Sequence, residues 1–71
     1  MRTTAQLKVR DALFAIIHEA SAQIEVAETG NFNPELSYEH NVRANKRVIT
    51  FNRRIVDETR AMLAKLDLLT R

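Results

Sequence analysis

The chain has 71 residues, no cysteine and a formal net charge of +2, so it suits one small domain without disulfide bonds, and its total charge selects no class of partner. No apolar run approaches the roughly 18 residues of a membrane span, and the N-terminus lacks the apolar segment of a secretory signal. One glycine, one proline and 45% hydrophobic residues favour an all-α protein over a disordered chain or a β-sheet. We therefore expect a single cytoplasmic domain, residues 1–71, that contacts no membrane and gains stability from oligomerisation or partner binding.

A capping box opens the first predicted helix. Gln6 follows Thr3 at a distance of three residues, which indicates a helix that begins at Thr4. Apolar residues then recur at steps of three or four up to Ala27, which predicts a helix over about residues 4–29. Gly30 follows the break in this period and suits the left-handed conformation after a helix end.

The second predicted helix is longer than the first. Asn33 is a good N-cap, Pro34 is tolerated at the first helical position, and the Glu35 carboxylate faces the positive end of the helix dipole there. Neither proline nor glycine follows, so we predict a turn at residues 30–33 and a helix over about residues 34–69. A connection this short makes the helices antiparallel, and the predicted fold is an all-α helical hairpin.

The length difference predicts an overhang at the C-terminal end. A chain folded about residues 31–32 brings Thr4 level with roughly residue 60, so the last ten or so residues of the second helix have nothing from the first helix to cover them. We expect another helix to cover them, either from a second copy, in a homodimeric four-helix bundle or a higher oligomer, or from another helical protein. The residues expected at this partner interface are Val48, Ile49, Asn52, Ile55, Val56, Thr59, Met62, Leu63, Leu66 and Leu69, with Leu13, Ile16, Ile17 and Ile24 as the opposite wall.

A polar line runs along the middle of this apolar stripe. It consists of Asn41, Asn45, Asn52 and Thr59, of which the last three are seven residues apart and share one helical face. A buried asparagine in a helical interface fixes register and oligomer number at a cost in stability. The alternative is that the line faces the first helix and that its amides are satisfied there or by water.

A basic group on the second helix supports a competing interpretation. Five basic residues and no acidic one lie between Asn41 and Arg54, and such a group can neutralise nucleic-acid phosphates. The predicted register instead sets Glu19 near Arg43 and Arg47, and Asp11 near Arg53, which favours an ion-paired, solvated face. Further pairs four residues apart are Glu39/Arg43, Arg53/Asp57 and Arg54/Glu58. The candidate nucleic-acid contacts are Arg43, Lys46, Arg47, Arg53 and Arg54.

Motifs for catalysis and cofactor binding are missing from the sequence. There is no glycine-rich phosphate loop or nucleophile elbow, and the two histidines have no evident catalytic partners. Acidic residues and His40 gather near the predicted turn, yet the paired Glu-x-x-His elements of di-iron bundles are absent. We therefore expect no catalytic residue, metal or cofactor. The group near the turn consists of Glu25, Glu28, Glu35, Glu39 and His40.

These patterns predict a non-enzymatic interaction protein that acts through helix packing, such as an adaptor, small chaperone, inhibitor or assembly component of bacterial or phage type. The alternative is a hairpin dimer that binds nucleic acid through the basic face. Phe32 and Tyr38 bracket the predicted turn and have two open interpretations: they cap the end of the bundle, or they anchor a partner.

Overall fold

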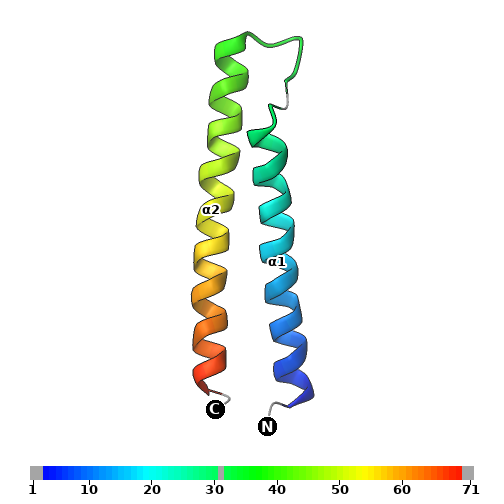
Figure 1. Ribbon diagram of the computed structural model, residues 1–71, viewed down its shortest axis with the longest axis vertical. Coiled ribbons are helices and arrows are strands. Elements are labelled where there is room, and N and C mark those ends of the chain that lie inside the picture. Colours follow the sequence, from blue (N-terminus) through cyan, green and yellow to red (C-terminus); the bar gives the residue numbers. More distant parts are fainter. Residues whose placement is uncertain (1–2, 31, 70–71) are drawn as a thin grey trace.

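Two antiparallel helices form the protein in a computed structural model that describes residues 3–30 and 32–69 (Figure 1). Helix α1 spans Thr4–Glu28 and helix α2 spans Tyr38–Leu69, with no strand among the described residues. The predicted all-α hairpin with a longer second helix is confirmed. The predicted domain 1–71 and turn 30–33 include residues 1–2, 31 and 70–71, which lie outside the described residues. Neither described helix has a stretch long and apolar enough to cross a membrane.

Both ends of α1 follow the sequence prediction. At its start, the Gln6 N–H donates to Thr3 Oγ1 (3.2 Å), and the Thr3 N–H donates to Gln6 Oε1 (2.7 Å), which completes the capping box. At its end, Gly30 adopts a positive φ of 83° after the C-cap Thr29. The helix ends at Glu28, one residue before the predicted position.

The start of α2 differs from the prediction. The helix begins at Tyr38, not at Pro34, and Ser37 is its N-cap, whose Oγ accepts from the His40 N–H (3.2 Å). Asn33 Oδ1 accepts from the Glu35 N–H (3.0 Å), and Asn33 O accepts from the Leu36 N–H (3.1 Å), which closes a turn over residues 33–36. The Asn-Pro-Glu sequence fits both roles, because asparagine and proline suit the first two positions of a β-turn as well as a helix start.

A single side chain from α2 holds this loop. The amide of Asn41 accepts from the Asn33 N–H (2.8 Å) and donates to the backbone oxygens of Asn33 (3.0 Å), Leu36 (3.3 Å) and Ser37 (3.0 Å). Asn41 is only 5% exposed, so these bonds replace water at a buried site. The loop is thereby fixed along the first turn of α2.

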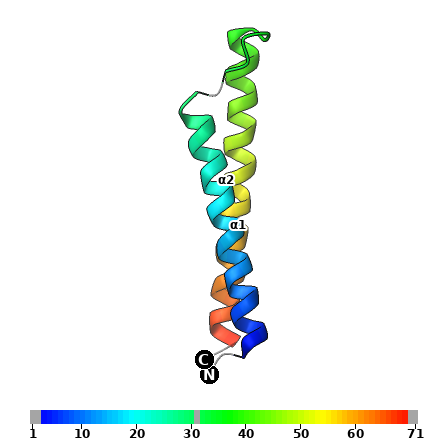
Figure 2. The same cartoon turned by 90° about the vertical axis from the view of Figure 1, so that its right-hand side faces the viewer.

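The register of the two helices follows from this loop and corrects the predicted overhang. The side chains that line the grooves between the helices place α1 residues near 20 beside α2 residues near 54. Equal rises then bring Thr4 level with about residue 70, and the end of α1 level with about residue 46. The prediction that the last ten residues of α2 lie beyond α1 is therefore wrong. The overhang lies at the loop end, where α2 continues past α1 (Figure 2), because the chain effectively folds about residue 37 and not about 31–32.

The core between the helices is small. Its buried apolar residues are Ala20 and Ala27 from α1 and Val56 and Leu63 from α2, and the alanines allow the helices to approach closely. Within the described residues no large side chain is fully buried, and thirteen large apolar side chains are at least 39% exposed. The hairpin therefore leaves most of its apolar surface available for other contacts.

Candidate interaction surfaces

One broad side of the hairpin is mainly apolar. At its centre lies a shallow groove of about 200 Å³ between the helices, lined by Ile16, Glu19, Ala20 and Gln23 of α1 and by Asn52 and Ile55 of α2. Residues seven apart in a helix share a face, so this side extends along both helices. We call it the open face, and it consists of Val9, Ile16, Val48, Asn52, Ile55, Met62, Leu66 and Leu69.

The open face is substantially exposed. Ile16 is 44% exposed, Val9 50%, Met62 53% and Leu69 81%, while Val48, Asn52, Ile55 and Leu66 are half-buried. These side chains lie along both helices, with Glu19 and Gln23 of α1 beside them at the groove. The open face is therefore a candidate contact surface for another helical element.

The opposite broad side is mixed in character. Its groove is lined by Ser21, Ile24 and Val56 together with charged residues of α2, including Arg53 and Asp57. Arg53 Nη2 lies 3.2 Å from Glu28 Oε1, and both side chains are at least half exposed. This side therefore carries charges on α2, although α1 also exposes Leu7 (45%) and Phe14 (47%) outside the open face.

The residues predicted for a partner interface divide into three groups. Val56, Thr59 and Leu63 are at most 9% exposed and are buried within the hairpin. Ile49 is half-buried toward the mixed side. The other six lie on the open face, and they are Val48, Asn52, Ile55, Met62, Leu66 and Leu69. That the whole set forms a partner interface stays a prediction. Of the predicted opposite wall, Ile16 is exposed, whereas Leu13, Ile17 and Ile24 are half-buried.

The polar line is largely occupied inside the hairpin. Asn41 binds the loop, as described above, and Thr59 is only 4% exposed. Asn52 is half-buried and its Nδ2 donates to the Val48 backbone oxygen (2.8 Å), while no described residue donates to its Oδ1. The alternative, in which the amides form their hydrogen bonds within the hairpin, thus describes Asn41. Asn52 instead retains its Oδ1 as an acceptor at the centre of the open face.

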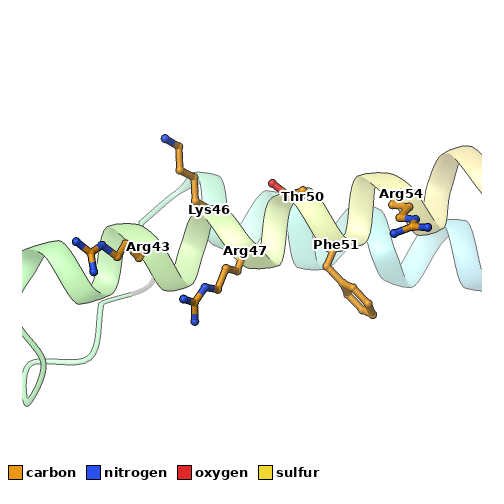
Figure 3. A pocket seen from close by; sticks show the side chains of 6 residues that line it. All are labelled: Arg43, Lys46, Arg47, Thr50, Phe51 and Arg54. Atoms are coloured by element: carbon orange, nitrogen blue, oxygen red, sulfur yellow. The ribbon is translucent and has the colours of Figure 1, made fainter.

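A second surface lies on the side of α2 that faces away from α1. Six residues at spacings of three and one share this helical face and border a shallow depression of about 560 Å³ (Figure 3). Phe51 is 65% exposed among four cations. We call this surface the basic face, and it consists of Arg43, Lys46, Arg47, Thr50, Phe51 and Arg54.

The observed register removes the ion pairs that were predicted for these cations. Glu19 lies level with about residue 55, some 12 Å or more along the helix axis from Arg43 and Arg47 at 1.5 Å per residue. Arg53 pairs with Glu28 and not with Asp11. Among the described residues, Arg43, Lys46 and Arg47 form no ion pair.

Of the pairs predicted within the helix, Arg54 Nε to Glu58 Oε1 (3.0 Å) is confirmed, while Arg43 forms none with Glu39 among the described residues. Arg53 bonds to Glu28 across the hairpin and not to Asp57. Within the described part of the chain, the basic face is therefore neutralised at its Arg54 end alone.

The acidic residues and His40 near the turn make separate contacts. Within the described part of the chain, no three acidic or histidine side chains come close enough to share a metal ion. Glu28 bonds to Arg53, and His40 Nδ1 lies 2.7 Å from Ser37 Oγ. Phe32 and Tyr38 stack with ring centroids 5.9 Å apart and are 50% and 72% exposed.

Sequence reasoning missed two contacts. The first is the role of Asn41, which joins residues eight positions apart and carries no local signature. The second is Arg10, whose guanidinium carbon lies 4.9 Å from the centroid of the Phe14 ring. Their spacing of four residues in a helix is a signal that could have indicated this pair.

The open face and the basic face are interpreted here from their own residues. Comparison with protein-family models, with curated proteins and with solved structures finds no match to this chain.

Proposed function

We propose that the protein is a non-enzymatic protein–protein interaction module, and that it pairs with a second copy of itself through the open face to form a four-helix bundle. The observation that supports this proposal is the exposure of large apolar side chains on the open face. Val9, Ile16, Met62 and Leu69 are at least 44% exposed on one side, while the other side carries the Arg53–Glu28 ion pair. Burial of apolar surface is the dominant favourable term in association.

The size of the open face supports a second copy as the partner. The two longer dimensions of the molecule, 53 and 16 Å, give each broad side a projected area of about 850 Å². Stable interfaces bury about 800 Å² per partner, so one hairpin laid on another supplies an interface of ordinary size. The pair would add the large apolar contacts that the alanine-rich core of one hairpin lacks.

The position of Asn52 supports a two-fold arrangement. Asn52 and Ile16 lie near the midpoints of α2 and α1 and border the same groove. A two-fold axis through this groove would bring the two Asn52 amides together, where the Oδ1 of each accepts from the other. Such a pair favours one register over its neighbours, which was the role predicted for this asparagine.

The proposal is tested by the mass of the protein in solution and by one charge substitution. We expect a dimer at micromolar concentration by sedimentation equilibrium, and we expect Met62→Glu to raise its dissociation constant at least about a hundredfold. The carboxylate would be buried twice, once per protomer, without a partner. Met62 is preferred to Leu63, because Leu63 is 9% exposed and its substitution would unfold the hairpin itself.

Leu68→Glu is the matched control. Leu68 is 64% exposed on the same helix and six residues from Met62, which turns it about 120° away from the open face. The Leu68→Glu protein should dimerise like the parent. A parent chain that is monomeric at 100 μM with intact helicity would refute self-association, as would equal weakening by both substitutions.

A further inference from the structure

The loop-end overhang places a cationic segment of α2 beyond the acidic residues of α1. α1 ends level with about residue 46, so Arg43 lies past its last turn. Glu28, the last residue of α1, bonds to Arg53 on the mixed side. At this end, α1 therefore does not run alongside α2 to neutralise its positive charge.

The charge along α2 changes sharply at Arg54. From Asn41 to Arg54 the sequence has five basic residues and no acidic one, whereas Asp57, Glu58 and Asp67 accompany Arg60 and Lys65 in the following part. Among the residues that the structure describes, Arg54 alone on the basic face has an acidic partner, Glu58, and that pair is well exposed. Exposed pairs of this kind contribute little to stability, so Arg54 is readily available to a stronger anion.

The spacing of these cations matches a polyanion. From Arg43 to Arg54 the helix rises about 16 Å at 1.5 Å per residue. One strand of a stacked double helix carries a charge about every 3.4 Å of its axis, so at most about five phosphates of a strand span that length. The basic face offers four cations, three of them arginines, whose guanidinium forks bind phosphate oxygens in pairs. Thr50 adds a hydroxyl donor between them.

The exposed ring on this face indicates an unpaired base. Phe51 is 65% exposed, and Figure 3 shows its ring and Arg47 directed to the same edge of the helix. Aromatic rings on single-strand-binding surfaces stack on bases while neighbouring cations hold the backbone. A paired duplex hides its base faces within the stack, so an exposed ring in this position suits a single strand.

The composition of the basic face disfavours an acidic protein as its ligand. Protein interfaces enrich arginine at their centre only together with aromatic and other apolar residues, and they are depleted of lysine. Here the single apolar residue Phe51 is surrounded by four cations, and the large apolar stripe of the molecule lies on the open face. A protein ligand would bury these charges with little apolar gain, whereas a phosphate backbone remains hydrated when it is bound.

From these observations we propose that the basic face binds single-stranded nucleic acid, with Arg43, Lys46, Arg47 and Arg54 on phosphates and Phe51 against one base. This site does not depend on the proposed self-association, because it lies on a different face of α2. RNA and DNA share the chemistry that it reads, namely phosphodiesters and an unpaired base.

The test is fluorescence anisotropy with labelled 20-nucleotide single strands of RNA and of DNA, a DNA duplex of the same length, and poly-glutamate as an acidic polypeptide. Release of counterions from a single strand gives a salt slope near −0.7 per phosphate neutralised, so three to four contacts predict a slope of about −2 to −3. The affinity should fall about 20- to 50-fold between 50 and 200 mM salt. Whichever of RNA and DNA binds more tightly identifies the source of the strand.

Two pairs of substitutions separate the basic face from total charge. Arg43→Gln with Arg47→Gln should weaken binding at least tenfold and reduce the salt slope by about 1.4, with helicity retained by circular dichroism. Arg60→Gln with Lys65→Gln removes the same charge from the same helix outside the basic face, and should change affinity less than threefold. Phe51→Leu should weaken binding about fivefold or more with an unchanged slope.

Three results would overturn the proposal. The first is no binding of either single strand at 50 mM salt, and the second is equal weakening by the two double substitutions. The third is tighter binding of poly-glutamate or of the duplex than of the single strands. Poly-glutamate as the best ligand would assign the face to an acidic protein, and the duplex as the best ligand would remove the stacking role of Phe51.

Discussion

Asn41 is the residue whose substitution tests the fold most directly. Its amide accepts one hydrogen bond from the Asn33 N–H (2.8 Å) and donates to three backbone oxygens, of Asn33, Leu36 and Ser37, at 3.0–3.3 Å. The two amide hydrogens are shared among three acceptors, so the side chain makes about three hydrogen bonds of full strength. At about 1 kcal/mol each, Asn41→Ala should lower the free energy of unfolding by about 2 to 3 kcal/mol.

Urea denaturation followed by circular dichroism at 222 nm measures this loss. With an m-value of about 1 kcal/mol/M for a protein of this size, the midpoint should fall by about 2 M or more. All proteins are compared at one concentration, because association contributes to the apparent stability.

Ser21→Ala is the control for Asn41→Ala, since Ser21 is an exposed polar residue without a hydrogen bond among the described residues. It should change the free energy by less than about 0.5 kcal/mol. A loss below about 1 kcal/mol for Asn41→Ala would refute the role of its amide in holding the loop.

Two further substitutions test the ends of α1. Gly30→Ala should destabilise the protein by about 1 kcal/mol in urea denaturation, because Gly30 has a φ of 83° and an added Cβ would lie 3.2 Å from the Phe32 ring. Gly30→Asn should be tolerated better, and equal stability of the alanine variant and the parent would contradict this reasoning. Thr3→Ala should lower the free energy of unfolding by about 1 kcal/mol and the melting temperature by about 5 °C, because Thr3 Oγ1 accepts from the Gln6 N–H. An unchanged melting temperature would show that the capping box adds nothing to stability.

Local rules were sufficient where the structure is local. The capping box of Thr3 and Gln6 and the positive φ of Gly30 each depend on residues within one turn, and both were predicted. The start of α2 was not, because Asn33-Pro34 suits a helix start and a β-turn equally well. The choice between them is made by Asn41, which lies eight residues away and binds the loop backbone. Such a contact is visible only after the chain has folded.

The error at the loop changed the register, and with it the interpretation of both surfaces. A shift of the folding point from residue 32 to about residue 37 brings Leu63 and Leu66 beside the first turns of α1, where Leu63 is 9% exposed. The same shift removes Glu19 from the neighbourhood of Arg43 and Arg47. The heptad spacing did predict which α2 residues share a face, yet it could not say which edge of that stripe α1 covers. That edge is fixed by the contacts of Ala20 and Ala27, which are buried between the helices.

The two proposed surfaces are compatible within one molecule because of their directions on α2. Ile55 of the open face and Arg54 of the basic face are consecutive residues, so their side chains diverge by about 100°. A second copy on the open face would therefore leave the basic face of each protomer accessible, and a dimer would present two cationic segments to one long strand. Two such sites would bind with an effective concentration set by the strand between them, which raises affinity without any new contact. Self-association would then strengthen strand binding, because the dimer supplies a second basic face. Strand binding does not require the dimer, because a single hairpin already contains one basic face.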